Sequence, residues 1–412
     1  MPLFALLVLA AAPFEKTSAG TALWAAPAIL AAAMLIAWAA ESAQFFIAQG
    51  FALAILAWLQ TLPEFAVEFV LAWKQRVDLL LAGLTGALRL LTGLGWPMIY
   101  FVAAFFYRRN HHQPLRCIRL QEGHAVEVVS LFVPLVYMIF VWFKSSLNVF
   151  DAAVLIAMYV AYLLVLRRLP AEELENVDEL EFVPRTILKS RPAVRASLII
   201  GFFAAGGILI YLSAEPFLGS LLAISAILGI PTFVFVQWVA PLVSEFPEKV
   251  SAFYWARTVD RAPMALMNMV SSNVNQWTLL TAMLPIVYSI SKGAVSPIPL
   301  DGQQELELLM TIAQSVLAMV FLLDMKLTWK EATALFTLWA VQFGFSPVKP
   351  GPGLAGYVAQ HIHHWITGVY VVWCAAAIVR LFLRRKMPAA FHLFGRIWNQ
   401  YIRPGAVAQP WE

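Results

Sequence analysis

Long apolar stretches, separated by short charged clusters, set the strongest limit on what this chain can fold into. A helix needs about 20 apolar residues to cross the hydrocarbon core of a bilayer, and the sequence offers about eleven such stretches. They lie at Ala22–Ala40, Ala43–Trp73, Val77–Tyr107, Ala125–Phe143, Ala152–Leu166, Ala196–Leu212, Gly219–Ala256, Ala262–Ser291, Leu306–Leu323, Trp329–Phe345 and His361–Phe382. Charged residues make up only 13% of the chain, whereas about 25% is usual in soluble domains. The pattern predicts an all-α polytopic membrane protein with about eleven transmembrane helices.

Prolines interrupt the longest of these stretches. Pro63 lies in one of them, Pro97 in another, and a third carries Pro231, Pro241 and Pro247. Proline removes a backbone hydrogen bond and clashes with the preceding turn. Membranes tolerate the resulting breaks only where the freed backbone groups find partners or line a cavity. We therefore expect broken helices here, with kinks that have no functional role as the alternative.

Composition and motifs exclude several other classes of protein. The net charge of +4 is small for 412 residues, which argues against nucleic-acid binding. Cys117 and Cys374 lie far apart and form no CxxC pair, so a disulfide framework, a zinc ribbon and a thioredoxin-type site are unsupported. Nucleotide-binding and hydrolase motifs are absent from the sequence. We expect no enzyme activity and no resident cofactor.

Basic residues mark alternate loops and give an expected orientation, because loops rich in Lys and Arg face the cytoplasm. Such loops carry Arg108, Arg109, Arg116 and Arg119; Arg167, Arg168, Arg185, Lys189, Arg191 and Arg195; Arg257 and Arg261; Lys326 and Lys330; and Arg384, Arg385 and Lys386. The loop near Asp301, Glu305 and Glu307 is acidic, and Lys74 and Arg76 are a mild exception on the outer side. We expect a plasma or inner membrane protein with its N-terminus outside and its C-terminus in the cytoplasm.

An acidic segment divides the chain into two halves of five spans each. It contains AEELENVDELEF, and we expect a cytoplasmic linker over residues 168–194. The first half would then comprise residues 22–167 and the second half residues 195–346. Residues 360–412 would add one C-terminal span and a cytoplasmic tail.

The two halves share one motif in opposite orientations. The first copy begins at Gln60 and reads QTLPEFAVEFVLAWKQRVDLLLAGLTGALRLL, and the second begins at Ser244 and reads SEFPEKVSAFYWARTVDRAPMALMNMVSSNVNQW. Each has Pro-Glu within an apolar helix, then a short basic turn, then a helix that opens with small or polar residues. The orientation argument puts the first basic turn outside and the second inside. The sequence therefore predicts two inverted five-helix repeats plus one C-terminal helix, and inverted repeats build binding sites at the membrane midplane.

The Pro-Glu pair has a chemical rationale inside a membrane. The proline frees backbone carbonyl oxygens, and the glutamate adds an anionic ligand one residue later. Carbonyl, carboxylate, amide and hydroxyl oxygens are the ligands that a hard cation such as calcium prefers. A charge at the bilayer centre costs about 2.5–3.5 kcal/mol, so Glu64, Glu68, Glu245 and Glu248 must pair or face a polar cavity. The alternative is a set of interhelical contacts that only holds the helices together.

On these residues the sequence resembles the sodium/calcium exchanger superfamily, also called cation/calcium exchangers. Family repeats read approximately Ser-x-Pro-Glu in one helix and Gly-Asn-x-x-Gly-Ser-Asn in the next. The first repeat keeps Thr61, Pro63, Glu64, Asp78 and Gly86, and the second keeps Pro247, Glu248, Asn268, Ser272 and Asn273. The resemblance covers residues 22–346, and the span after His361 looks like an addition.

The resemblance implies roles for several residues. Glu64 and Glu248 match the paired acidic ligands of the transported cation. The polar ligands of the second repeat match Asn268, Ser272 and Asn273. Thr61 stands at the Ser/Thr position of the family, and Glu245 replaces that residue in the second repeat. The first repeat departs from the family pattern, because Gly83 and Leu88 stand where it has asparagines, within a register uncertainty of one residue.

Three charged residues are candidates for coupling or modulation. Glu68 follows Glu64 on the same helix face, as a second ligand, a proton carrier or a hydrogen-bond partner. Lys249 lies four residues after Glu245, which favours neutralisation of Glu245 over a ligand role. Arg89 falls on or beside the position that matches Asn273. It either pairs with Glu68 for stability or acts as a tethered cation that fills one of the family's sites.

Three histidines, His361, His363 and His364, lie close together in the last span. A metal site is one interpretation. A belt at the membrane interface, shared with Trp365, is the interpretation that we favour.

Together these features predict a secondary active antiporter that exchanges calcium or sodium against sodium or protons by alternating access. Its partners would be the lipid bilayer and the transported ions, without nucleic acid. Proton coupling would use the same glutamates, because protons and cations compete for one carboxylate. The alternatives are a proton-coupled exchanger of monovalent cations, and a membrane sensor or scaffold that keeps the exchanger fold without transport.

Overall fold

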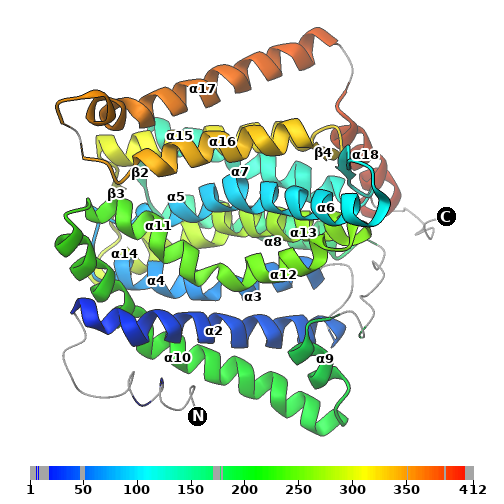
Figure 1. Ribbon diagram of the computed structural model, residues 1–412, viewed down its shortest axis with the longest axis horizontal. Coiled ribbons are helices and arrows are strands. Elements are labelled where there is room, and N and C mark those ends of the chain that lie inside the picture. The colour runs from blue at the N-terminus through cyan, green and yellow to red at the C-terminus, as the bar shows by residue number, and fades with distance from the viewer. Residues whose placement is uncertain are drawn as a thin grey trace. The chain divides into compact units, whose positions relative to one another are not determined.

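The computed structural model describes residues 18–46, 52–169, 180–349, 351–384 and 387–403, together with residues 6, 8 and 177. Over this part of the chain the fold is helical, apart from four short strands (Figure 1). Most of the acidic segment near residue 175 lies outside the described residues.

Helices of the first half precede the acidic segment. They are α2 (Ala22–Ala43), α3 (Ala52–Gln60), α4 (Leu62–Trp73), α5 (Ala82–Leu90), α6 (Trp96–His111), α7 (Ala125–Phe143) and α8 (Val149–Leu166). Strands β1 (Cys117–Arg119) and β2 (Ser146–Leu147) flank α7. A π-helical turn, η4 (Leu91–Gly95), joins α5 to α6, and short 3-10 turns occupy Ala19–Thr21 and Gln44–Phe46.

The second half repeats this order. Its helices are α10 (Pro192–Leu228), α11 (Thr232–Ser244), α12 (Phe246–Ala256), α13 (Ala262–Asn275), α14 (Thr281–Lys292), α15 (Gly302–Leu322) and α16 (Trp329–Phe345). Strands β3 (Ile298–Pro299) and β4 (Lys326–Thr328) flank α15, and the π turn η7 (Gln276–Leu280) joins α13 to α14. The remaining elements are α9 (Phe182–Leu188), the 3-10 turn Val259–Arg261, α17 (Leu354–Arg384), α18 (Ala389–Ile397) and the π turn Trp398–Ile402.

Seven of the described helical segments are long and apolar enough to cross a membrane. They are Ala19–Phe46, Ala82–His111, Ala125–Phe143, Val149–Leu166, Pro192–Leu228, Gly302–Leu322 and Leu354–Leu383. The other four expected spans fall on helices that are broken, short or more polar, namely α3 with α4, α11 with α12, α13 with α14, and α16. The predicted all-α polytopic fold is confirmed.

Both Pro-Glu motifs lie where a span breaks in two. The first break is at Thr61, whose hydroxyl donates to the carbonyl of Trp58 at 2.9 Å. The second is at Glu245, which separates α11 from α12. In each case the proline sits at the start of the new helix, where a missing N–H costs nothing. Thr61 and Glu245 therefore hold the same place in the two repeats, as the sequence motif predicted.

Some expected boundaries are wrong. Pro97 does not break its span, because it follows the π turn η4 at the first positions of α6. Pro216 lies inside α10, which runs on to Leu228 and ends at Gly229 in the left-handed conformation, with a φ of 63°. The expected boundary between residues 212 and 219 is therefore absent. The span expected from Val77 begins only at Ala82.

The short strands show that the two halves run in opposite directions. Strand β1 pairs with β4, and β2 pairs with β3. Helix α7 thus begins beside β4 and ends beside β3, whereas α15 begins beside β2 and ends beside β1. These two helices hold the same place in the two halves. The predicted inverted repeat follows from these pairings alone.

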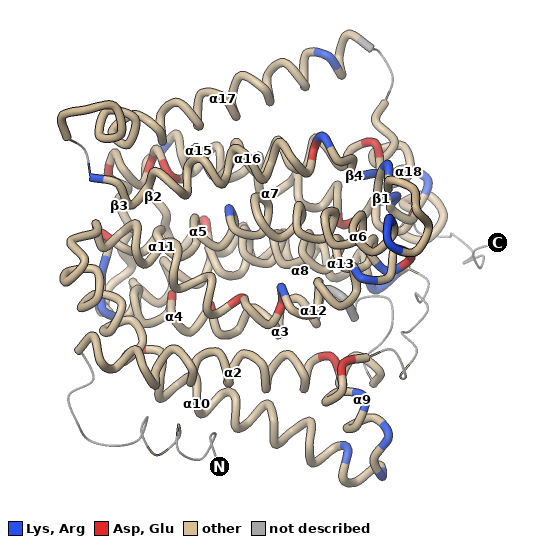
Figure 2. The backbone as a smooth tube through the Cα atoms, viewed as in Figure 1, with Lys and Arg blue, Asp and Glu red and all other residues tan. Residues whose placement is uncertain are grey.

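Basic residues gather at one end of these helices. Lys and Arg lie around β1, β4 and α18 (Figure 2), including Arg116, Arg119, Lys326, Lys330 and Arg396. The turns next to β2 and β3 carry Lys144, Lys292, Asp301 and Glu305 instead. This asymmetry favours the β1–β4 end as the cytoplasmic one.

The chain forms two compact units, and each takes segments from both halves. The first unit comprises Met1–Ala87 and Ala171–Ser251, and the second comprises Leu88–Pro170 and Ala252–Glu412. In the first unit α2 packs along α10, where Gly206 leaves room for the side chain of Ile36. Both Pro-Glu motifs belong to this unit. In the second unit α15 packs against α7 and α17. The repeat boundaries expected from the sequence stay a prediction.

Gly86→Ala should destabilise the protein. A Cβ atom at Gly86 would lie 1.7 Å from the backbone carbonyl oxygen of Gln237 on α11, so a backbone must move. We expect a loss of about 1–3 kcal/mol, measured by thermal unfolding in detergent. Gly207→Ala on α10 is the matched control, because nothing lies within 4 Å of its added Cβ. Equal stability of the two variants would contradict the close approach of α5 and α11.

The two basic turns that follow the Pro-Glu motifs should face opposite sides of the membrane. Arg76 precedes the helix that starts at Ala82, whereas Arg257 stacks on Phe106 near the other end of that helix, 5.2 Å from its ring centre. Single cysteines at positions 76 and 257, in a background without Cys117 and Cys374, should differ in labelling by an impermeant maleimide on whole cells. Position 76 should react and position 257 should not. Equal labelling would refute the orientation.

Candidate functional site

Four glutamates form one buried group in the first unit. Glu64 and Glu68 lie on α4, and Glu245 and Glu248 lie at the start of α12. Their exposed fractions range from 1% to 3%. Glu64 interacts electrostatically with the three other carboxylates and with Lys249. The sequence predicted that these residues come together, and within this unit they do.

Local structure favours negative charge at two of these positions. Glu64 lies in the first turn of α4, and Glu248 lies in the first turn of α12. Backbone N–H groups at the start of a helix have no partner within the helix and attract anions, an effect of about 0.3–1 kcal/mol per charge. The break in each span is what creates a helix start inside the apolar region. The proline therefore helps to place the glutamate that follows it in the first turn of a helix.

Lys249 balances part of the negative charge. Its ammonium forms an ion pair with Glu245 four residues earlier, and it lies 3.9 Å from Glu248. The pairing of Lys249 with Glu245 agrees with the sequence interpretation. Four carboxylates with one ammonium still leave the group strongly negative when all are ionised. Charge in an apolar interior is costly, so the group gains stability by taking up protons or cations.

A glycine makes room for Glu68. A Cβ atom at Gly83 on α5 would lie 1.6 Å from Oε1 of Glu68, so this carboxylate rests directly against the backbone of α5. Within the described residues the other oxygen, Oε2, accepts no hydrogen bond. Glu68 thus keeps a buried oxygen that a proton or a cation can use. The sequence identified Gly83 as a lost asparagine, and the structure shows what occupies the space.

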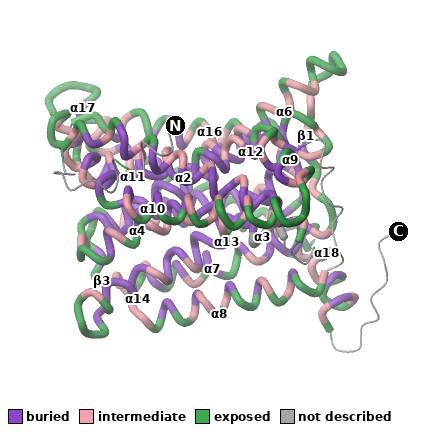
Figure 3. The backbone as a smooth tube through the Cα atoms, turned by 90° about the horizontal axis from the view of Figure 1, so that it is seen from below, coloured by how far each residue is buried: buried purple, intermediate pink, exposed green. Residues whose placement is uncertain are grey.

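The polar residues of the second repeat lie on α13, in the second unit. This helix is buried along most of its length (Figure 3). Asn268, Ser272 and Asn273 are completely buried. The amide of Asn273 donates to the carbonyl of Met269 at 3.0 Å, while its Oδ1 accepts no hydrogen bond from any described residue. Amide and hydroxyl oxygens buried in this way suit cation binding.

The π turns give a register between the repeats that differs by one residue from the register of the Pro-Glu motifs. Thr92 in η4 and Thr278 in η7 each donate to a carbonyl one turn earlier, at 2.9 Å and 2.5 Å. When Leu91 is aligned with Gln276, the first residues of the two turns, Leu88 falls on Asn273 and Arg89 falls beside it. The first repeat therefore has an apolar residue where the second has an amide.

Arg89 has a partner that the sequence did not indicate. Its Nη2 lies 2.7 Å from Oε2 of Glu307 on α15, and both side chains are buried. From the sequence, a pair with Glu68 was the alternative to a tethered cation, and Glu307 is the partner that the structure shows. Glu307 was assigned to an acidic loop with Asp301 and Glu305, whereas it lies inside α15 and is 1% exposed. Glu307 lies just inside the expected span Leu306–Leu323, and this position was the signal that could have revealed its burial in a helix.

The histidines of α17 do not form a common site. His363 contacts Glu307, whereas His361 contacts the carbonyl of Tyr357 at 2.9 Å and stacks on Trp365. Within the described residues no three His, Cys, Asp or Glu side chains converge closely enough to hold a metal ion together. This also applies to the glutamates, which interact with one another at longer range in this conformation.

Comparison with known proteins identifies the family. The family model of the sodium/calcium exchanger protein matches residues 16–167 and 198–346. A crystal structure described as the H⁺/Ca²⁺ exchanger CAX is 33% identical, with a TM-score of 0.82, over 96% of each chain. A comparison with curated proteins gave no match.

Two more distant structures share the fold. That of native YfkE is 15% identical, with a TM-score of 0.60, over 84% of this chain and 99% of that one. That of the sodium-calcium exchanger NCX_Mj is 16% identical, with a TM-score of 0.52, over 82% of this chain and 99% of that one. The inverted halves, the paired Pro-Glu breaks and the matching family model together show that this chain belongs to the sodium/calcium exchanger family.

Proposed function

We propose that this membrane cation antiporter exchanges calcium against protons, and that Glu64 and Glu248 bind the two in turn. The observation that carries the proposal is the group of four buried glutamates, of which Glu245 pairs with Lys249. A carboxylate that releases its proton can accept a calcium ion, and a protonated one cannot. The same side chains can therefore alternate between a protonated and a cation-bound state.

The residues of the first repeat support protons over sodium as the counter-ion. Sodium ions need cages of several oxygen ligands, whereas a proton needs one carboxylate. Gly83 and Leu88 offer no side-chain oxygen where the family pattern has asparagines. Glu68 adds a carboxylate next to Gly83. Replacing neutral oxygen ligands by an acid reduces the capacity for sodium and increases the capacity for protons.

The comparison supports the same assignment. The structure that is 33% identical is described as an H⁺/Ca²⁺ exchanger. Calcium prefers several oxygen ligands at 2.3–2.6 Å, about six to eight in all. In the first unit we propose Thr61 as a further ligand beside Glu64 and Glu248. In the second unit Asn268, Ser272 and Asn273 stay proposed cation ligands. Binding would draw the glutamates closer together than they lie in this conformation.

Glu68 is proposed to carry a proton rather than to hold calcium. Its carboxylate lies against α5, and one oxygen accepts no hydrogen bond from the described residues. Lys249 is proposed to lower the charge of the group through Glu245, so that Glu245 is not a ligand. These assignments separate cation binding from proton uptake within one group of side chains.

Glu64→Gln and Glu248→Gln should each abolish exchange. The amide keeps the size of the side chain but removes the charge that offsets the dehydration of calcium. Everted vesicles with a pH-sensitive dye, given pulses of calcium, sodium or potassium, measure the activity and identify the ion. Glu215→Gln is the matched control, since Glu215 is an exposed residue that pairs with Lys74. Normal transport by both site variants would show that the motif glutamates are structural.

Glu68→Gln should lower the number of protons moved per calcium ion while calcium still binds. The expected reason is that one proton-carrying carboxylate is lost and the calcium ligands stay. The ratio can be measured in proteoliposomes from simultaneous calcium and pH signals, with calcium affinity from isothermal titration. An unchanged ratio would remove Glu68 from the coupling, and a loss of calcium binding would make it a ligand.

A further inference from the structure

A second buried network of charged groups lies in the second unit. Arg89, at the end of α5, pairs with Oε2 of Glu307 on α15. The other oxygen of this carboxylate, Oε1, contacts Nδ1 of His363 on α17. The second ring nitrogen of His363, Nε2, lies 3.2 Å from the hydroxyl of Ser346 at the end of α16. Glu307 and His363 thus connect four helices, and the proposed transport residues do not include either of them.

The hydrogen bonds of His363 can be satisfied in both protonation states. Nδ1 faces a carboxylate, so it carries a hydrogen in either state. In the neutral ring Nε2 is an acceptor, and the Ser346 hydroxyl can donate to it. In the charged ring Nε2 donates to Ser346, whose hydroxyl then points to the carbonyl of Gln342 at 2.7 Å. Taking up a proton therefore requires the rotation of a single hydroxyl group.

The imidazole is the most exposed of the three charged or titratable side chains in this network. The side chain of His363 is 18% exposed, whereas those of Arg89 and Glu307 are 0% and 1% exposed. His363 lies near the start of α17, and Glu307 lies near the start of α15, so both are at the β2–β3 end of these helices. This end is the one opposite to the basic loops.

Among the described residues, the charged or titratable groups that face His363 and its partners are few. Glu307 comes from α15, Arg89 comes from α5, and Tyr370 on α17 interacts electrostatically with Arg89. Helix α16 contributes Gln342 and Ser346, which do not titrate. With neutral His363 the formal charges of Arg89 and Glu307 cancel. Protonation of the ring leaves one positive charge in excess.

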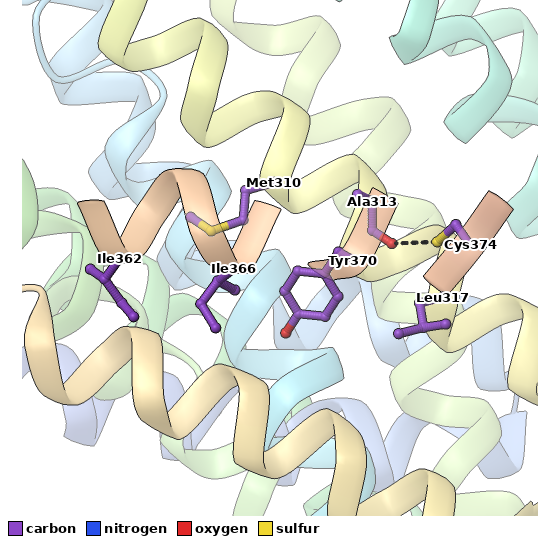
Figure 4. Packing of buried hydrophobic residues seen from close by; sticks show 7 residues of the cluster. All are labelled: Met310, Ala313, Leu317, Ile362, Ile366, Tyr370 and Cys374. Carbon is purple, nitrogen blue, oxygen red and sulfur yellow. Dashed lines mark hydrogen bonds between the residues drawn. The ribbon is translucent and has the colours of Figure 1, made fainter. Parts of the chain in front are cut away.

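Apolar packing holds α17 on α15 next to this network. Figure 4 shows Ile362, Ile366 and Tyr370 of α17 facing Met310 and Ala313 of α15. The thiol of Cys374 also contacts the Ala313 carbonyl at 3.3 Å. The two helices therefore stay together whatever the charge of His363, and a change of charge acts on the link to α5.

The link to α5 involves both the side chain and the backbone of Arg89. Its guanidinium pairs with Glu307, and its carbonyl accepts a hydrogen bond from Gln314 of α15 at 3.0 Å. Six residues earlier the same helix carries Gly83, which rests against Glu68. A change in the contacts between Arg89 and α15 can therefore be transmitted along α5 to Gly83.

We propose that His363 and Glu307 form a proton-binding site separate from the transport glutamates, through which pH adjusts how firmly α15 and α17 hold the end of α5. When His363 is protonated, Glu307 has a second cationic partner, and the attraction between Glu307 and Arg89 becomes weaker. The effect on exchange rests on the proposed function. Proton binding by His363 does not.

Exchange measured at equal pH on both sides of a proteoliposome tests the effect on transport. The ratio of the rate of His363→Gln to that of the wild type should change by about threefold or more between pH 5.5 and 8, the range in which a histidine titrates. The ratio for His361→Gln should stay constant, because this histidine contacts the Tyr357 carbonyl and Trp365 instead of Glu307. A constant ratio for His363→Gln would overturn the link to exchange.

NMR of detergent-solubilised protein labelled with ¹⁵N-histidine tests the proton site without transport. The signal missing from His363→Gln identifies His363 in the wild type. It should titrate between pH 5 and 8.5 and show hydrogen on Nδ1 in the neutral form. Hydrogen on Nε2 instead, or no titration, would overturn the site. If the wild type exchanges no ion, the proposed function fails, and this measurement still decides whether the proton site exists.

Discussion

The burial of negative charge in an apolar helical assembly is the constraint on which the rest of the first unit depends. Glu64, Glu68, Glu245 and Glu248 are almost fully buried, and Lys249 beside them carries the opposite charge. The span breaks give two of these carboxylates a helix start, and Gly83 gives a third one room. Each of these devices reduces the cost of burial without removing it. The remaining cost is what makes the group responsive to protons and cations.

The two repeats are more alike in their backbone features than in their side chains. Both halves have a break before Pro-Glu and a π turn in the next span. The side chains on this common frame differ, because Leu88 stands opposite Asn273 and Arg89 stands opposite an apolar valine. The symmetric part fixes where helices start and bend. The asymmetric part differs in chemistry, since both repeats supply buried glutamates but only the second keeps the amides Asn268 and Asn273.

Sequence reasoning predicted most of the fold, because apolar spans, prolines and basic loops are local signals. It paired Lys249 with Glu245 from their spacing, and the structure contains that pair. It missed the partner of Arg89, because Glu307 is more than 200 residues away and follows Asp301 and Glu305 closely in the sequence. It also missed both π turns. In the first of them Trp339 packs closely against Gly93, a tertiary contact that no short pattern reveals.

The strand pairs between the halves have a consequence for the origin of the chain. Strand β1 follows the third span of the first half and pairs with β4, which follows the fourth span of the second half. Strand β3 follows the third span of the second half and pairs with β2, which follows the fourth span of the first half. Such reciprocity is the mark of an isologous interface. Two identical five-helix chains could therefore form both pairs at once, about a two-fold axis in the plane of the membrane. In the present protein both strand pairs form within a single polypeptide.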